Sequence, residues 1–113
     1  MNPKDARDTS GVKNISVFIS EIGERLSSHV LPYISLLLPH LSGESYMMRN
    51  GIIQMLGFLV AKAFTENSKE NSSREDLLNI LEERFLDMNS WTRGKVLQTW
   101  QYLFQYEISV KFL

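Results

Sequence analysis

The feature that most constrains the fold of this chain is a hexapeptide pattern that occurs twice. Residues 49–54 read RNGIIQ and residues 93–98 read RGKVLQ, so the two copies begin 44 residues apart. Each copy has an arginine, two variable residues, two large aliphatic residues and a glutamine, and each follows an apolar run and a short polar turn. We therefore expect two units, each made of a helix, a turn and a second helix that opens with the arginine.

A two-helix unit that repeats every ~40–47 residues is typical of HEAT and armadillo arrays. The sequence accordingly predicts an all-α fold, a HEAT-type α-solenoid fragment of about five helices with two antiparallel helix pairs and one preceding helix. Each pair has an apolar face too wide for its own partner to cover, so the units are expected to stack. Apolar residues at helical spacing place the helices at about 12–28, 31–41, 46–64, 73–86 and 91–106.

Three segments lie outside these expected helices. Residues 1–11 carry a proline, a glycine and several charges, so we expect a disordered arm. Residues 65–73 contain no large apolar side chain, which indicates an exposed loop, with Ser72 and Glu75 as a capping box for the next helix. Residues 107–113 alternate in hydropathy and are left unassigned.

Small residues and one proline indicate how the helices pack. Glycine inside a helix costs about 1 kcal/mol relative to alanine, so Gly23, Gly51 and Gly57 indicate places where a neighbouring helix approaches closely. Pro39 lies within the first helix of the first unit and removes a backbone hydrogen bond there, which predicts a bent helix. The turn at residues 42–45 offers a serine at either end as the N-cap of the next helix.

Composition narrows the class of protein. The chain has 113 residues, a net charge of −1 and no cysteine. The near-neutral balance argues against strong, non-specific attraction to nucleic acid, and the lack of cysteine rules out disulfides and thiolate metal sites. No apolar run reaches the ~20 residues that a membrane span needs, and no secretory signal is visible at the N-terminus. We therefore expect a soluble intracellular protein with no membrane partner.

Arg49 and Arg93 each open the second helix of a unit, about one turn past the polar turn. In a structural role, each arginine would donate to turn carbonyls and to an acidic turn residue, which forms a ladder between successive turns. That acid is Asp87 in the second unit and is displaced to Glu44 in the first. In a functional role, the arginines would contact DNA together with Lys95. The structural role is the favoured hypothesis. These three residues are the only candidates for phosphate contact, which is a weak signal for DNA binding.

Nothing in the sequence indicates catalysis. His29 and His40 are the only histidines, and no cysteine or paired carboxylate stands at metal-ligand spacing near them. No nucleophile elbow or glycine-rich phosphate loop is visible. Trp91 and Trp100 are interpreted as core residues or as contact surface for the next unit. We expect no enzyme, no metal, no cofactor and no small-molecule substrate.

Longer segments around the two hexapeptides resemble one family. Residues 38–51 (LPHLSGESYMMRNG) and 81–100 (LEERFLDMNSWTRGKVLQTW) resemble successive HEAT units of the first non-SMC regulatory subunit of condensin I. Residues 15–26 fit the helix that precedes them, so the resemblance covers roughly residues 12–105. It is specific because it includes turn residues that generic HEAT repeats do not share.

The resemblance implies a non-catalytic scaffold that binds the kleisin and SMC subunits of condensin and engages DNA during mitotic chromosome condensation. It implies a location in the nucleus and on chromosomes, with the cytoplasm as a second compartment. It carries over no catalytic residue, because the family's ATPase lies in the SMC subunits. Family members are many times longer, so we expect a truncated form. The alternative is a free-standing helical adaptor that binds a peptide on its concave face, with the helix at 46–64 forming the groove.

Overall fold

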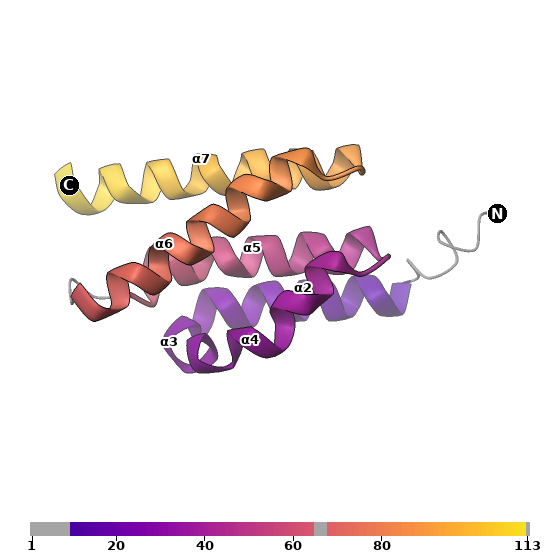
Figure 1. Cartoon of the computed structure of the whole chain (residues 1–113), viewed down its shortest axis with the longest axis horizontal. Helices are drawn as coiled ribbons and strands as arrows, with labels where there is room; N and C mark the ends of the chain where they lie inside the picture. Colours follow the sequence, from indigo (N-terminus) through magenta and orange to yellow (C-terminus); the bar gives the residue numbers. More distant parts are fainter. Residues whose placement is uncertain (1–9, 65–67, 113) are drawn as a thin grey trace.

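The computed structural model of the chain describes residues 10–64 and 68–112, which form two layers of helices (Figure 1). In the first, which we call the parallel layer, three long helices run in the same direction. These are α2 (Ser10–Arg25), α5 (Tyr46–Lys62) and α7 (Ser90–Phe112). In the second, which we call the return layer, the chain runs back to begin the next long helix. Its elements are α3 (Ser27–Val30), η1 (Leu31–Tyr33), α4 (Ile34–Leu37), η2 (Leu38–Ser42), α6 (Ser68–Glu83) and η3 (Arg84–Leu86).

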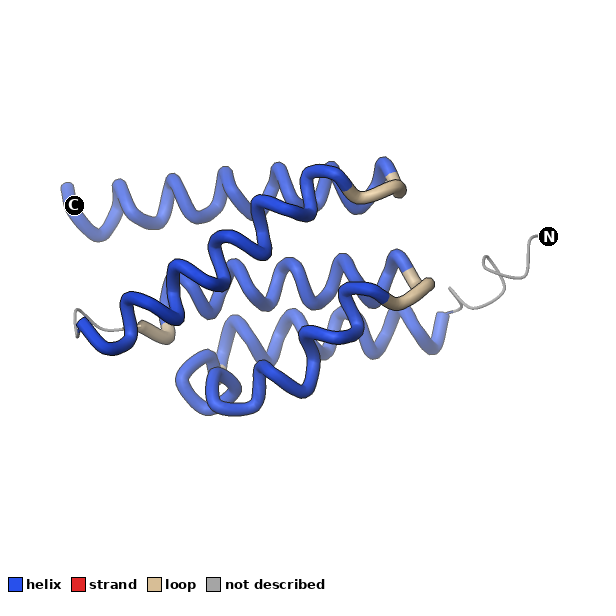
Figure 2. The backbone as a smooth tube through the Cα atoms, in the orientation of Figure 1, coloured by secondary structure: helices blue, strands red, loops and turns tan. Residues whose placement is uncertain are grey.

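The two layers combine into two antiparallel helix pairs that stack side by side. The segment from η1 to η2 pairs with α5, and α6 with η3 pairs with α7, while α2 precedes both pairs (Figure 1). The turns that close the two pairs lie at the same end of the molecule (Figure 2). No strand occurs in residues 10–64 and 68–112. The all-α, HEAT-type fold predicted from the repeat is therefore confirmed.

The first return segment is broken into short pieces where prolines interrupt it. Pro32 lies in η1 and Pro39 lies in η2, and each stands at the start of its 3₁₀ turn. A proline has no backbone N–H and clashes with the carbonyl four residues earlier, so it kinks or breaks an α-helix that would pass through its position. The bend that Pro39 predicts is present. It lets the segment curve around α5.

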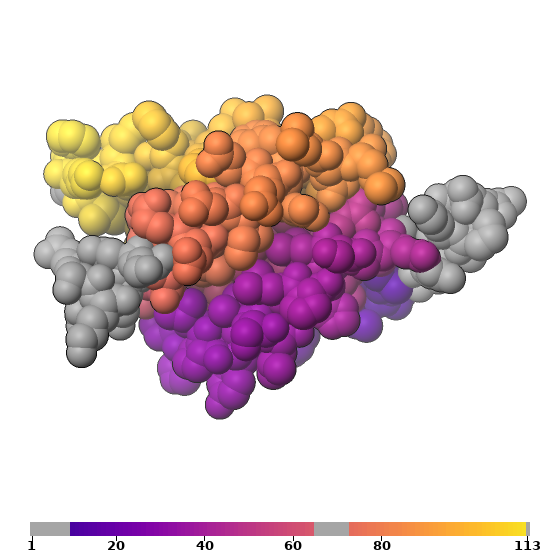
Figure 3. All heavy atoms as spheres, in the orientation of Figure 1, coloured from indigo at the N-terminus to yellow at the C-terminus, as the bar shows by residue number. Residues whose placement is uncertain are grey.

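Helix α5 lies at the centre of the core. Its residues 51–60 are buried except for Gln54, and the return segments cover it on the face seen in the space-filling view (Figure 3). Burial of each of these aliphatic side chains stabilises the folded state by roughly 1.5–3 kcal/mol relative to leaving it exposed. The buried hydrophobic cluster comprises Leu41, Ile52, Ile53, Met55, Leu56, Leu59, Val60, Leu77, Leu81, Val96 and Leu103.

Small residues bring the helices of the parallel layer close together. A Cβ added at Gly51 would lie 2.5 Å from Ser16 Oγ and 2.9 Å from Ser16 Cα, so only glycine fits against α2 there. On the other side of α5, a Cβ added at Gly57 would lie 2.5 Å from Thr99 Cγ2 of α7. Ser16 Oγ also donates a 2.6 Å hydrogen bond to the carbonyl of Met47. The prediction that these glycines mark close helix contacts is confirmed.

Three element boundaries differ from the expected ones. Helix α2 begins at Ser10, and residues 1–9 of the expected arm lie outside the described residues. Helix α6 already begins at Ser68, so Ser72 lies within the helix and is not its N-cap. Helix α7 continues to Phe112, through the tail that was left unassigned. No glycine or proline follows Gly94, so the sequence contains no signal that would end α7 at the expected residue 106.

Two long polar contacts join described residues at the ends of the helices away from the turns. Lys62 Nζ donates to the carbonyl of Glu24 at 3.3 Å, and this contact is exposed to solvent. Arg74 Nε donates to the carbonyl of Val60 at 3.4 Å. Both distances exceed the usual length of an N–H···O hydrogen bond. Among the described residues, the polar contacts at this end are therefore longer than those at the turns.

The contact between α2 and α5 makes a matched pair of glycine substitutions informative. Gly51→Ala is expected to lower the free energy of unfolding by about 1–3 kcal/mol, because the new methyl group overlaps the backbone of Ser16. Gly94→Ala, in an exposed position of α7 with nothing within 4 Å of the new Cβ, is expected to raise it by about 0.4–1 kcal/mol. Urea unfolding followed by circular dichroism measures both. Equal effects of the two substitutions would contradict the close approach.

Candidate functional site

The turns of the two units share one design. Ser45 precedes α5 and accepts a hydrogen bond at its Oγ from the backbone N–H of Met48, at 3.1 Å. Asn89 precedes α7 and accepts one at its Oδ1 from the backbone N–H of Thr92, also at 3.1 Å. Ser45 and Asn89 are N-caps at equivalent places in the 44-residue repeat. The repeat seen in the sequence is therefore a repeat of local structure.

The two arginines of the hexapeptides also lie in equivalent positions. Arg49 Nη1 donates to the carbonyl of Gly43 at 2.9 Å, and Arg93 Nη1 donates to the carbonyl of Asp87 at 2.7 Å. In each unit the acceptor is the residue six positions before the arginine. Arg49 Nη1 also lies 3.2 Å from the carbonyl of Glu44. Each arginine thus closes its own turn through backbone carbonyls.

Arg49 also joins the first unit to the second. Its Nε donates to Asp87 Oδ2 at 2.8 Å, and its Nη2 donates to Asp87 Oδ1 at 2.9 Å. The two side chains are only 8% and 4% exposed. Bidentate arginine–carboxylate pairs are the strongest hydrogen bonds of this kind in proteins. The backbone N–H of Asn89 donates to the same carboxylate at 2.9 Å, so Asp87 organises its own turn as well.

The surroundings of Asp87 keep its carboxylate ionised. Burial disfavours the charged form, but hydrogen bonds from Arg49 and from the N–H of Asn89, and the positive charges of Arg49 and Arg84, outweigh this effect. The pKa of Asp87 is consequently held below its ordinary value. A carboxylate held in this way stabilises the fold and is not available as a proton donor near neutral pH.

Arg84 is a further member of this cluster that the sequence did not single out. It is half-buried in η3, and its Nη1 donates to the carbonyl of Leu41 in η2 at 2.9 Å. Its position three residues before Asp87 was the only available signal. Arg84 adds a second tie between the two return segments at the end of the molecule where the turns lie.

The residues considered for DNA contact fall in three different environments. Arg49 is 7% exposed and all three of its guanidinium nitrogens donate to protein acceptors, so it presents no free cation to a phosphate and the expectation of a DNA contact there is corrected. Arg93 is exposed at the start of α7, and Lys95 is half-buried further along it.

Trp91, which was expected to be core or contact surface, is 74% exposed, so it is not core. Trp100 is half-buried and stacks on Phe85.

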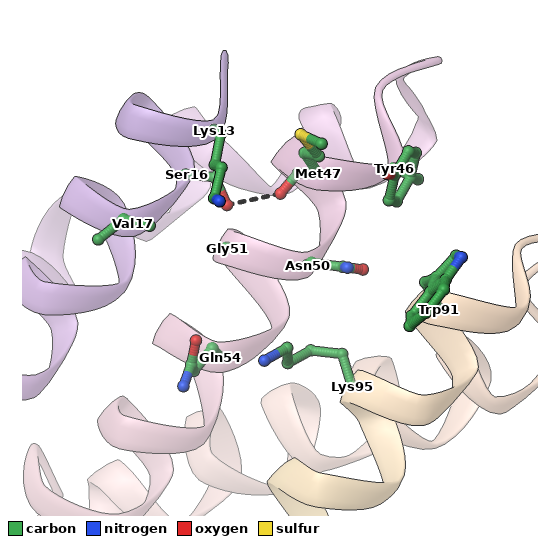
Figure 4. A pocket seen from close by; sticks show the side chains of 10 residues that line it. All are labelled: Lys13, Ser16, Val17, Tyr46, Met47, Asn50, Gly51, Gln54, Trp91 and Lys95. Carbon is green, nitrogen blue, oxygen red and sulfur yellow. Dashed lines mark hydrogen bonds between the residues drawn. The ribbon is translucent and has the colours of Figure 1, made fainter. Parts of the chain in front are cut away.

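A pocket of about 390 Å³ opens on the parallel layer, where α2, α5 and α7 begin (Figure 4). Asn50 extends toward Trp91, and the amine end of Lys95 lies near Gln54 (Figure 4). A smaller recess of about 80 Å³ adjoins it along α5 and α7 and shares Gln54 and Lys95. We call the two together the amide groove, after their amide side chains. The pocket is lined by Lys13, Ser16, Val17, Tyr46, Met47, Asn50, Gly51, Gln54, Trp91 and Lys95, and the recess by Gln54, Phe58, Lys95, Gln98, Thr99 and Tyr102.

Other kinds of site are not seen in the described part of the chain. Among the side chains that the structure describes, those of residues 10–64 and 73–112, no three histidines, aspartates or glutamates gather in a way that could hold a metal ion. Among the same residues, no helix combines the length and the apolar character that crossing a membrane requires.

Two equivalent hairpins with parallel second helices, joined turn to turn by a buried arginine–carboxylate pair, define a segment of a HEAT-type helical solenoid. The chain is 39% identical over 101 residues to "Condensin-1 complex subunit CAP-D2" of Arabidopsis thaliana and 35% identical over 103 residues to "Condensin complex subunit 1" of Xenopus laevis. It is 36% identical over 96 residues to the protein of the same name in Mus musculus. The chain therefore belongs to the condensin complex subunit 1 family.

The chain corresponds to a small part of these relatives. The aligned regions cover 83%, 88% and 82% of the chain but only 7%, 8% and 7% of the Arabidopsis, Xenopus and mouse proteins. No family model matches the chain, and no solved structure matches it significantly.

The lowered pKa of Asp87 predicts how stability depends on pH. Its ionised form stabilises the fold above the pKa of the unfolded chain, about 4, and this contribution is lost as the pH falls through the lower pKa of the folded state. Asp87→Asn leaves Arg49 buried without its anion, so at pH 7 we expect a loss of about 3 kcal/mol in the free energy of unfolding.

Urea unfolding at pH 7 and at pH 3 tests this expectation. The difference between Asp87→Asn and the unchanged chain should shrink at the lower pH. The matched control is Glu107→Gln, which removes an exposed ion pair with Lys111 and is expected to change stability little. A loss in Asp87→Asn that is the same at both pH values would show that the carboxylate charge is not its cause.

Proposed function

We propose that this chain acts as a non-catalytic HEAT-repeat scaffold segment within the condensin complex. Membership of the condensin complex subunit 1 family supports the proposal that the chain acts within this complex. The resemblance described above supports the kleisin and SMC subunits as its partners, mitotic chromosome condensation as its process, and the nucleus and chromosomes as its place of action. In this role the chain supplies surfaces that position other subunits, and the chemistry of ATP hydrolysis belongs to the SMC subunits.

The observation that carries the scaffold role is an apolar face left open on α7. Leu97 and Phe104 of α7 are 53% and 72% exposed. Their equivalents 44 residues earlier, Ile53 and Val60 of α5, are 0% and 2% exposed. On α5 this face is covered in the folded chain, so the same face on α7 is suited to cover by another helical unit.

Arg93 supports the same conclusion. It binds the carbonyl of its own turn as Arg49 does. In Arg49 the Nε and Nη2 atoms then bind Asp87 of the next unit. For Arg93, no acceptor within the described residues is seen for these two atoms. The ladder of Arg49, Asp87, Arg93 and the Glu44 turn is thus proposed to continue, with Arg93 taking an acid from the turn of an adjoining unit.

DNA is the less favoured of the proposed partners. Of the three basic residues considered for phosphate contact, Arg49 is buried and engaged. Arg93 and Lys95 alone do not provide the several phosphate contacts on which non-specific DNA affinity depends. We therefore propose that subunit binding is the primary role and that DNA is engaged together with other subunits.

Retention of partners tests membership of the complex. The chain, immobilised at its N-terminus, is expected to retain a purified kleisin–SMC complex at micromolar concentration, and an unrelated helical protein of similar size is not. If neither retains the complex, the proposed condensin role of this segment is contradicted.

Self-association tests the open face. Sedimentation velocity is expected to show concentration-dependent association of the chain, because exposed apolar patches on repeat units pair with one another. Replacing Leu97 and Phe104 with Gln should yield a monomer. Leu86→Gln removes a side chain that is 89% exposed but lies outside α7, so it should leave the association unchanged. A chain that stays monomeric at all concentrations would favour the free-standing adaptor instead.

A further inference from the structure

We propose that the amide groove binds an extended, acidic peptide segment, a proposal that rests on the scaffold role above only in assuming that the chain works by binding. The groove runs along α5 and α7 on the parallel layer. The residues that would recognise the peptide are Lys13, Asn50, Gln54, Trp91, Lys95 and Gln98. None of them belongs to the turn ladder.

The charge of the groove favours an acidic partner. Lys13 and Lys95 line it, and no carboxylate is among its lining residues. This is a local excess of positive charge on a chain whose net charge is −1. The described residues provide no acceptor for Lys95 Nζ, so its charge is free to pair with a ligand. Complementary charge of this kind selects partners and orients them as they approach.

The amide side chains favour a peptide over a nucleic acid. Asn50 and Gln54 are one turn apart on α5, and Gln98 lies across from them on α7. An amide offers both donors and an acceptor, which matches the alternating N–H and C=O groups of a peptide backbone. A phosphodiester backbone offers acceptors only, so it would leave the amide oxygens without partners. Asn50 Oδ1 is already shielded from solvent, and no described group donates to it.

Trp91 provides the apolar anchor of the groove. Its side chain is 74% exposed at the edge of the pocket, although tryptophan is usually largely covered. Tyr46 lines the same pocket from the start of α5 (Figure 4). Exposed aromatic residues beside polar groups are typical of the residues that contribute most to protein interfaces. A large apolar side chain of the ligand would pack against this edge.

The shape of the groove defines how far apart the recognised side chains of the peptide lie. The pocket of about 390 Å³ and the recess of about 80 Å³ share Gln54 and Lys95, so the cavity is elongated. In an extended peptide, side chains two positions apart point to the same side. The groove therefore fits an acidic residue on Lys95 and a large apolar residue on Trp91, separated by one residue that faces solvent.

The test uses the whole 113-residue chain and a defined probe. The probe is the peptide acetyl-Asp-Ser-Leu-Ser-Asp-amide, which presents an acid two positions from leucine in either direction. Titration at millimolar peptide is followed by ¹H–¹⁵N NMR of the side-chain amides of Asn50, Gln54 and Gln98 and the indole N–H of Trp91. We expect saturable shifts of these signals, and none with the matched peptide acetyl-Lys-Ser-Leu-Ser-Lys-amide.

Variants of the chain separate recognition from folding. Lys95→Glu should weaken binding by about tenfold or more, because it places like charges together. Gln54→Leu keeps the size of the side chain but removes its hydrogen bonds, and should weaken binding severalfold. Lys111→Glu, the same charge change at an exposed position outside the groove, should leave binding unchanged. The backbone spectrum of each variant verifies that the fold is retained.

Three results would overturn the proposal. They are an absence of shifts with the acidic peptide, equal shifts with the lysine peptide, or binding that survives Lys95→Glu. Shifts produced by a 12-base-pair DNA duplex in place of the acidic peptide would make the groove a nucleic-acid surface. None of these results bears on retention of the kleisin–SMC complex, so failure of the groove proposal and failure of the condensin role are distinguishable.

Discussion

The buried pair between Arg49 and Asp87 is the interaction on which the arrangement of the two units depends. It joins two residues that are 38 positions apart in the chain, and its charges are removed from solvent, so neither partner can be lost without leaving the other unpaired. The pair also organises both turns, because Arg49 binds carbonyls of its own turn while Asp87 accepts the N–H of Asn89. One ion pair thus specifies local structure and the register between units at the same time.

The packing along the helices follows from that register. With the turns aligned, Gly57 lies against Thr99 of α7. On the other side of α5, Gly51 lies against Ser16 of α2, so α5 approaches both neighbours closely in the parallel layer. Larger apolar side chains fill the space between this layer and the return layer. The face left open on α7 and the amide groove are both products of this arrangement, because they occupy the sides of the parallel layer that the return segments do not cover.

Much of this structure could be predicted from the sequence because it repeats. The 44-residue offset placed Arg49 and Arg93 in equivalent positions, and glycines inside helices indicated close contacts. The start of α6 at Ser68 could not be predicted, since residues 65–73 lack the apolar spacing that indicates a helix. The extension of α7 was missed for a similar reason: the last residues are exposed, and no apolar face marks them as helical. The amide groove was missed because Lys13, Asn50 and Trp91 come from three helices and form no local motif.

The uneven distribution of contacts between the two ends of the hairpins has a mechanical consequence. At the end with the turns, the units are joined by the bidentate pair and by Arg84 bound to Leu41. At the opposite end, the polar contacts seen between the side chains of residues 10–64 and 73–112 and their neighbours are the long ones from Lys62 and Arg74. Under tension, adjacent units are expected to separate first at the end opposite the turns. They would then rotate relative to one another about a hinge at the turns. The array would then change its curvature while the order and spacing of its turns stayed fixed.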